Sequence, residues 1–232
     1  MRPLVIGHRG AAAHALENTQ ASFEQAVGFG VDMIELDVHE SLDGEFIVIH
    51  DSHLGRISAR REIVRKTPAA ILKSVPLRGK HRLLTLSEAF EVIPPAVGIM
   101  VEIKVIRSFE KMAGFLKQQS NHRQVLATSF DLSLLLQLHN LRTGLSLGVV
   151  SKTPGNLAKA AAIGLEFRDV YLDFQCLTKL RTAQLQELYG RVFAWTVDRP
   201  RDIRRMLEYG IDGIISNQPD EVCRIMKSLD LS

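Results

Sequence analysis

The pattern of apolar and polar residues predicts strands that alternate with helices along the whole chain. Across residues 33–51 the two kinds of residue alternate with a period of two, Asp43-Gly44 supplies a turn, and a second β-rich run follows at 46–49. This pattern predicts a β-hairpin. Apolar runs predict further strands at 4–7, 98–104, 125–129, 145–150, 170–174, 192–197 and 211–216. Helical spacing predicts helices between them, at 21–27, 85–93, 109–118, 131–141, 156–163, 178–189, 200–209 and 219–227.

Eight strand-then-helix units follow one another when the hairpin is counted once, and the composition does not change along the 232 residues. Such repetition implies a parallel sheet, and eight units in a chain of this length fit a closed (β/α)8 barrel better than an open doubly wound sheet. No GxGxxG motif favours the open form. We therefore expect a single TIM-barrel domain over residues 1–232.

One stretch is too long to be an ordinary connection in this barrel. Residues 53–82 are polar and basic, and only one short helix, at 69–73, is indicated within them. Long segments of this kind in compact domains tend to be lids or specificity segments. We expect a small insertion after the second strand.

Charge and cysteine content exclude several classes of function. The chain has 29 Lys and Arg against 26 Asp and Glu, and its basic pairs are scattered, which does not predict a nucleic-acid surface. Cys176 and Cys223 lack metal-ligand spacing and do not suggest a disulfide framework. No apolar stretch is long enough for a membrane span, or at the N-terminus for the core of a secretory signal. We expect a cytoplasmic monomer or homodimer that acts on a small molecule.

Polar residues recur at the carboxyl ends of the predicted strands, which is the face where barrel enzymes carry their active sites. These residues are His8, Glu35, Asp37, Glu102, Lys104, Ser129, Trp195 and Asn217. Their recurrence in unit after unit predicts one site on this rim.

The three carboxylates of this set predict a metal site. On a strand, Glu35 and Asp37 point to the same face with Cβ atoms about 6 to 7 Å apart, and Glu102 follows on the next strand of the sheet. A divalent cation relieves the repulsion of such a cluster, and oxygen ligands favour Mg²⁺ or Ca²⁺ over zinc. A solvent-facing acidic edge and a simple ion pair between Glu102 and Lys104 are the alternatives, and the second is compatible with a metal.

Basic residues beside this cluster predict a phosphate ester as ligand. Arg9 and Lys104 add positive charge, and a guanidinium group matches phosphate oxygens bidentately. His8 and His50 end two strands close in the sheet, and two imidazoles suit phosphodiester hydrolysis, because one accepts a proton and the other delivers one. The other histidines, His14, His39, His53, His81, His122 and His139, are expected at the surface or in the core, with His39 and His53 nearest to the site.

Together with neighbouring motifs, these residues resemble the glycerophosphodiester phosphodiesterase family. The motifs occur in order across nearly the whole chain: His8-Arg9-Gly10, Glu17-Asn18-Thr19, Glu35-Leu36-Asp37-Val38, Asp43-Gly44, His50-Asp51, Glu102-Ile103-Lys104, Thr128-Ser129-Phe130, Ala194-Trp195-Thr196-Val197 and Asp212-Gly213-Ile214-Ile215. Each motif is weak by itself, but the set at these spacings is specific.

The resemblance implies a metal-dependent TIM barrel that hydrolyses glycerophosphodiesters, such as deacylated phospholipid headgroups, to glycerol 3-phosphate and an alcohol. It assigns acid–base catalysis to His8 and His50, metal binding to Glu35, Asp37 and Glu102, phosphate contacts to Arg9 and Lys104, and a substrate-side wall to Trp195. Two other functions stay open. One is lysophospholipase D-type hydrolysis of lipid-bearing diesters, and the other is non-catalytic phosphodiester binding by the same barrel.

The chain departs from the family pattern at positions outside the expected chemistry. Leu16 stands where the family usually has proline, residues 52–58 lack the usual Arg-Thr-Thr, and Asp198 stands where asparagine is usual. Since loops near the pocket mouth set which alcohol fits, these differences concern headgroup preference, which we expect to depend on residues 53–82.

Overall fold

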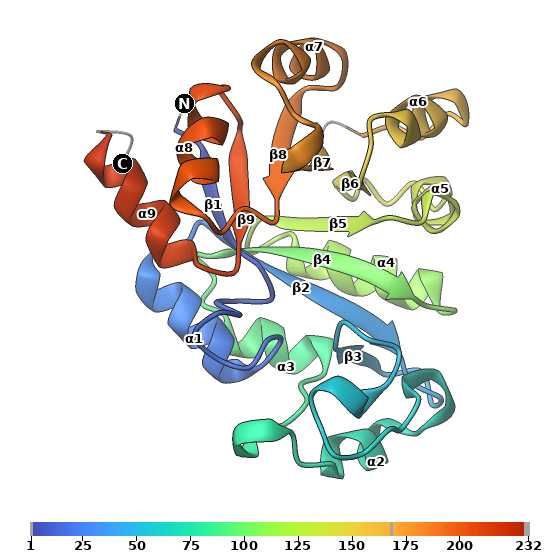
Figure 1. Cartoon of the computed structure of the whole chain (residues 1–232). Helices are drawn as coiled ribbons and strands as arrows, with labels where there is room; N and C mark the ends of the chain where they lie inside the picture. Colours follow the sequence, from blue (N-terminus) through green and yellow to red (C-terminus); the bar gives the residue numbers. More distant parts are fainter. Residues whose placement is uncertain (1, 168, 230–232) are drawn as a thin grey trace.

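A computed structural model describes residues 2–167 and 169–229, which form a closed barrel of eight parallel strands surrounded by helices (Figure 1). The barrel strands are β1 (Leu4–Gly7), β2 (Met33–Glu40), β4 (Gly98–Val105), β5 (Val125–Ser129), β6 (Leu147–Ser151), β7 (Asp169–Asp173), β8 (Arg191–Trp195) and β9 (Gly213–Ser216). Pairing between β1 and β2 and between β1 and β9 closes the sheet. The predicted (β/α)8 barrel is confirmed.

One helix follows each barrel strand and covers its outer face. These helices are α1 (Gln20–Phe29), α3 (Leu86–Val92), α4 (Phe109–Gln119), α5 (Leu132–Asn140), α6 (Gly155–Ala162), α7 (Lys179–Tyr189), α8 (Pro200–Glu208) and α9 (Pro219–Ser228). Side-chain caps begin several of them. Thr19 caps α1, and Thr85 forms a reciprocal capping box with Glu88 at the start of α3, as their spacing predicts. None of the helices within the described ranges combines the length and the apolar character needed to cross a membrane.

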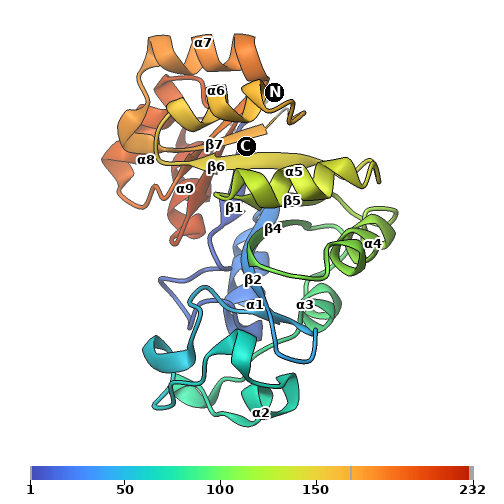
Figure 2. The ribbon, with the colours of Figure 1, turned by 90° about the vertical axis from the view of Figure 1, so that its right-hand side faces the viewer.

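The predicted hairpin and insertion are present after β2. Strand β3 (Phe46–Val48) pairs antiparallel with the end of β2, and the chain then forms α2 (Ala69–Ser74) and the 3₁₀ turns η1 (Leu54–Arg56), η2 (Val64–Lys66) and η3 (Arg78–Lys80) before α3. The insertion lies beyond β2, on the opposite side of the molecule from α6 and α7, in both views (Figures 1 and 2). It has an apolar core of its own, formed by Ile47, Ile49, Leu54, Ile57, Val64, Ala69, Leu72, Val75, Leu77 and Leu83.

Some strand ends differ from the predicted ones. Strand β8 ends at Trp195 rather than Val197, and β9 begins at Gly213 rather than Ile211. The backbone N–H of Val197 still donates to the carbonyl of Ile215 at 3.0 Å, so pairing continues for one bond after the strand has turned. An apolar run therefore overestimates strand length where the chain leaves the sheet but stays buried.

The barrel interior is filled by one side chain from each strand. These side chains are Ile6, Met33, Met100, Leu126, Val150, Tyr171, Phe193 and Ile215. The rings of Tyr171 and Phe193 stack with centroids 4.8 Å apart. Glycines on neighbouring strands make room for them: a Cβ on Gly148 would lie 2.5 Å from Tyr171 Cε2, and one on Gly213 would lie 2.5 Å from Phe193 Cδ1.

We expect Gly213→Ala to lower the free energy of unfolding by about 1–3 kcal/mol, because the new methyl group overpacks the interior beside Phe193. Gly114→Ala in α4 is the control, since a Cβ there meets no atom within 4 Å and alanine favours a helix interior. Urea denaturation of both variants measures the difference. Equal midpoints for Gly213→Ala and the unmodified chain would contradict the packing explanation.

Candidate active site

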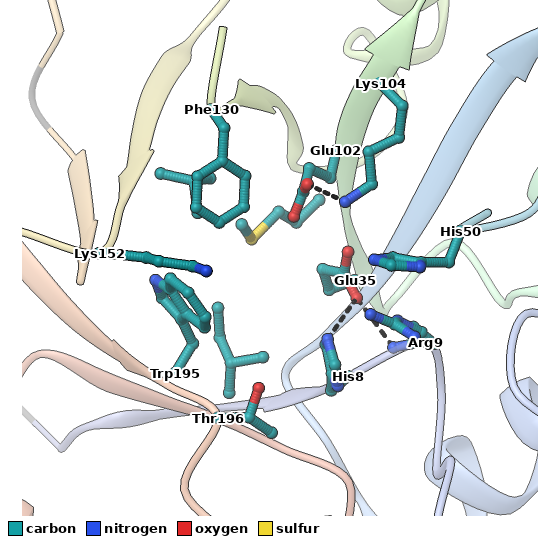
Figure 3. A pocket seen from close by; sticks show the side chains of 13 residues that line it. His8, Arg9, Glu35, His50, Glu102, Lys104, Phe130, Lys152, Trp195 and Thr196 are labelled. Carbon is teal, nitrogen blue, oxygen red and sulfur yellow. Dashed lines mark hydrogen bonds and ion pairs between the residues drawn. The ribbon is translucent and has the colours of Figure 1, made fainter. Parts of the chain in front are cut away.

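A layer of mostly polar side chains lies next to the apolar interior of the barrel, toward the carboxyl ends of the strands. Since alternate residues of a strand face the same side, the next interior position lies two residues beyond each filling residue. These positions hold His8, Glu35, Glu102, Thr128, Lys152, Asp173, Trp195 and Asn217. Five of them, namely His8, Glu35, Glu102, Lys152 and Trp195, line a pocket of about 350 Å³ (Figure 3). Arg9, Met100, Lys104, His50, Phe130, Val150, Thr196 and Ile215 complete its lining.

The three predicted metal ligands come together on one side of this pocket. Glu35, Asp37 and Glu102 are buried, and each offers a carboxylate oxygen within 4.8 Å of the other two. Burial and the charges of Asp37 and Glu102 raise the pKa of Glu35 well above its usual range. Glu35 Oε1 is buried and has no hydrogen-bond partner among the described residues. A crowded all-oxygen cluster with an unpartnered carboxylate oxygen fits a hard divalent cation.

Lys104 neutralises part of this cluster, as the ion-pair alternative expected. Its Nζ lies 2.9 Å from Asp37 Oδ1 and also contacts Glu102 Oε1. Burial opposes ionisation of Asp37, but Lys104 and Arg9 outweigh it and lower the pKa of that carboxyl. Asn18 donates to Asp37 Oδ2 at 2.8 Å. The basic neighbours thus favour ionisation of Asp37, whereas burial and the neighbouring carboxylates disfavour ionisation of Glu35.

Arg9 follows β1 and reaches two carboxylates of the cluster. Its backbone adopts a left-handed conformation with φ 52°, which is uncommon outside glycine, and its backbone N–H donates to Glu35 Oε2 at 2.8 Å. Its Nε lies 3.1 Å from Asp37 Oδ2, and Nη1 donates to Glu17 at 2.9 Å. These contacts leave Nη2 for a ligand in the pocket.

His8 is oriented by an amide. Its Nδ1 lies 2.7 Å from Asn217 Oδ1, and Asn217 Nδ2 donates to Asp198 Oδ2 at 2.8 Å, so the amide oxygen faces the imidazole. Nδ1 therefore carries the proton, and Nε2 faces Glu35 Oε2 at 4.0 Å. Burial and the charge of Arg9 lower the pKa of His8 to about 4, which keeps the ring neutral near pH 7. Asp198, one of the departures noted in the sequence, thus contacts the amide that holds His8.

His50 is oriented by a carboxylate instead. Its Nδ1 lies 2.7 Å from Asp51 Oδ1, so its Nε2 remains available to the pocket. Burial opposes ionisation of Asp51, but hydrogen bonds from Arg56 and His50 overcome it and bring the pKa of Asp51 to about 2. His39, which the sequence left uncertain, contacts the His50 carbonyl through Nε2 at 3.0 Å and supports its backbone. The structure therefore holds the two histidines with unlike partners.

Arg56, in the insertion, binds the two carboxylates that contact His50 and Arg9. Its guanidinium donates to the two carboxylate oxygens of Glu17 at 2.6 Å each, and its Nε donates to Asp51 Oδ2 at 2.7 Å. Glu17 in turn contacts Arg9. Among the described residues, none of 53–82 lines this pocket, and Arg56 joins the insertion to Glu17 and Asp51 by hydrogen bonds. The expected dependence of headgroup preference on residues 53–82 stays a prediction.

We expect Arg56→Met to lower kcat by roughly 10- to 100-fold, because hydrogen bonds to charged groups contribute about 1.5–3 kcal/mol each and Asp51 would lose its orientation. Arg56→Lys should recover part of the rate. Arg60→Met is the control, since Arg60 is an exposed residue of the same insertion. Steady-state kinetics with a melting curve for each variant separates loss of positioning from loss of folding. A kcat equal to that of Arg60→Met would show that Arg56 does not position the site.

The far wall of the pocket is aromatic. Phe130 and Trp195, the latter expected as a substrate-side wall, both line the pocket and meet edge to face with centroids 5.4 Å apart. Trp195 Nε1 is buried without a hydrogen-bond partner among the described residues. Lys152 lies on the same side (Figure 3). The strand pattern did not single out this lysine, although it follows the apolar run of β6 by the spacing that places His8 and Trp195.

Comparisons with known proteins agree with this geometry. Residues 8–221 match the Glycerophosphoryl diester phosphodiesterase family. A glycerophosphodiester phosphodiesterase of Caldanaerobacter subterraneus subsp. tengcongensis is 28% identical over 98% of this chain and 99% of that protein. One from Bacillus subtilis is 26% identical over 97% of this chain and 87% of that protein.

Solved structures share the fold. An Oleispira antarctica phosphodiesterase in complex with the product sn-glycerol-3-phosphate superposes with a TM-score of 0.87 at 23% identity, over 97% of each chain. A glycerophosphodiester phosphodiesterase from Thermotoga maritima gives a TM-score of 0.80 at 24% identity, over 97% of this chain and 99% of that one. The family match covers the pocket and nearly the whole barrel, so this chain belongs to the glycerophosphoryl diester phosphodiesterase family and is a phosphoric diester hydrolase.

Proposed function

We propose that this chain hydrolyses glycerophosphodiesters to glycerol 3-phosphate and an alcohol, with a divalent cation and two histidines. One observation carries the proposal: a buried carboxylate cluster and two imidazoles, each held through Nδ1, face the same pocket. The names of the relatives and the glycerol 3-phosphate bound to the Oleispira antarctica phosphodiesterase support the substrate class.

The carboxylate cluster is the proposed site for the cation. Glu35, Asp37 and Glu102 would hold Mg²⁺ or Ca²⁺, since their oxygens are hard ligands and Glu35 Oε1 has no other partner among the described residues. When bound, the cation would supply positive charge to the phosphate oxygens.

Basic residues around the cluster are the proposed phosphate contacts. Arg9 has Nη2 free of its contacts to Glu17 and Asp37, and Lys104 lies at the pocket edge beside Glu102. Both groups would stabilise the charge that collects on the phosphate oxygens as the bond to the alcohol breaks. Trp195 would face the organic part of the substrate.

The two histidines have partners that suit opposite roles. His8 is held neutral beside an amide, so its Nε2 would take the proton of the attacking hydroxyl. His50 is held through Nδ1 by Asp51, so its Nε2 faces the pocket and would give a proton to the leaving alcohol. The attacking group is water or the glycerol hydroxyl next to the phosphate. Detection of a cyclic glycerol phosphate would identify the second.

Release of glycerol 3-phosphate from glycerophosphoethanolamine and glycerophosphocholine, with Mg²⁺, with Ca²⁺ and with chelator, tests the proposal. We expect release that requires a metal. Release only from lysophosphatidylcholine would support the lysophospholipase D alternative, and no release from any diester would support a non-catalytic barrel.

We also propose that residues 1–232 act as one catalytic domain, since the family match spans most of the barrel. The cytoplasmic location and the monomeric or homodimeric state remain predictions from the sequence.

A further inference from the structure

The pocket has two chemically different halves (Figure 3). One half carries the carboxylates, both histidines, Arg9 and Lys104, which account for a cation and a phosphate. The other half is formed by apolar and aromatic side chains, namely Met100, Phe130, Val150, Trp195 and Ile215, together with one charged residue, Lys152. The phosphate chemistry makes no use of this second half, so it is available to the organic group attached to the phosphate.

Lys152 is directed into this second half. It follows β6 by the strand period that places Trp195 on β8, and its side chain points into the pocket beside the aromatic wall. It is exposed and forms no ion pair with any residue in 2–167 or 169–229. On the neighbouring strand β7, Asp173 accepts a hydrogen bond from the Gln175 backbone at 2.9 Å and does not line the pocket. The ammonium of Lys152 therefore faces the ligand space without forming an ion pair among the described residues.

The aromatic wall alone would suit a cationic alcohol, because aromatic faces attract quaternary ammonium groups. The charges around it oppose that use. Lys104 Nζ already lies 5.7 Å from the centre of the Phe130 ring, and Lys152 approaches the same half from the opposite side. Trp195 Nε1, a donor without a partner among the described residues, also lies in this wall. The half thus offers positive charge and a donor, which complement an anionic group and repel a cationic one.

We propose that Lys152 forms an anion-binding subsite for the alcohol part of the substrate, so that the enzyme prefers glycerophosphodiesters whose alcohol carries a carboxylate or a second phosphate over those with a cationic alcohol. This inference rests on the proposed function and specifies its substrate class. Opposite charges at a solvated site attract modestly, so the selectivity due to Lys152 is roughly twofold to fivefold.

Two diesters that differ only by a carboxylate test the subsite directly. Glycerophosphoserine is glycerophosphoethanolamine with a carboxylate added to the alcohol, so the ratio of their kcat/KM values isolates that group. We expect a ratio above one for the unmodified chain and a ratio roughly twofold to fivefold lower for Lys152→Met, with Lys152→Glu reversing the preference. Lys159→Met in α6 makes the same change in net charge at an exposed residue outside the pocket, and its ratio should equal that of the unmodified chain.

A second pair of substrates distinguishes the two sources of negative charge. Glycerophosphoglycerol has a neutral alcohol, whereas 1,3-bis(glycerophospho)glycerol adds a second phosphodiester to it. A Lys152-dependent preference in this pair alone identifies a phosphate as the group bound, and a preference in the serine pair alone identifies a carboxylate. Either result supports the subsite.

Three outcomes would overturn the inference. Rates and ratios that both stay unchanged in Lys152→Met would show that the ammonium does not sense the substrate. An equal loss for all four substrates would place Lys152 on the phosphate they share. If the unmodified chain with metal hydrolyses none of the diesters, the proposed function fails and the subsite fails with it, whereas turnover with unchanged ratios removes only the subsite.

Discussion

Removal of divalent cations is expected to lower the rate of glycerophosphodiester hydrolysis by at least ~10²-fold, and addition of Mg²⁺ or Ca²⁺ should restore it. The magnitude follows from the several kcal/mol by which a bound cation stabilises developing charge on a phosphate. The structural reason lies in Glu35, whose pKa is raised by burial and by its two acidic neighbours. A bound cation would relieve the repulsion among the carboxylates and would favour the ionised form of Glu35.

Glu35→Gln tests the same site without relying on activity. The amide keeps the shape of the side chain but removes one charge and weakens a hard-metal site. Calorimetric titration with Mg²⁺ and Ca²⁺ should show weaker binding than in the unmodified chain, and the metal-dependent rise of the melting temperature should shrink accordingly. Glu91→Gln on the outer helix α3 is the control, because Glu91 lies outside the cluster. Unchanged metal affinity in Glu35→Gln, or full activity in chelator, would remove the cation from the mechanism.

Replacement of either His8 or His50 is expected to cause the second large loss of activity. His8→Ala and His50→Ala are each expected to lower kcat by roughly 10²- to 10⁴-fold, the range for loss of a positioned acid or base. Their Nδ1 atoms are already held by Asn217 and Asp51, so each ring presents Nε2 to the pocket, and an alanine leaves no group to replace it. Steady-state kinetics at saturating metal and substrate measures both losses.

An exposed histidine provides the comparison for these variants. His122→Ala removes an imidazole between α4 and β5, at the surface, and should keep the full rate. A leaving group that needs no proton separates the two roles: with a p-nitrophenyl ester of glycerol phosphate, the loss in the variant of the acid should become smaller, whereas the loss in the variant of the base should persist. A His50→Ala enzyme as active as His122→Ala would exclude His50 from acid–base catalysis.

The barrel was predictable because local patterns suffice to define it. Strand and helix periods of 2 and 3.6 mark each unit, and caps such as Thr85 with Glu88 mark where helices begin. The grouping of Glu35, Asp37 and Glu102 was also predictable, since two lie on one strand at alternate positions and the third lies on its parallel neighbour. The alternation of side chains along β2 and the pairing of β2 with β4 together place these three side chains next to one another.

The contacts around Arg56 could not be predicted in the same way. They join segments near Glu17 and Asp51 that share no period and no strand pairing, and they depend on the path of the insertion. Lys152 is a different case. The apolar run of β6 stops at Val150, so the polar residue two positions later looked like the start of a loop, although β6 extends to Ser151 and the next residue still faces the pocket.

Lys104 gives the protein an internal counter-ion. Its ammonium contacts both Asp37 and Glu102, so one positive charge of the chain already lies within the cluster, and the apolar core extends around the whole barrel independently of that cluster. Folding would therefore not require the ion, unlike in small domains that unfold without it. Under the proposed function, a divalent cation would enter a cluster that already holds one ammonium, and in a cell poor in that metal the enzyme would stay folded and regain activity when the ion returns.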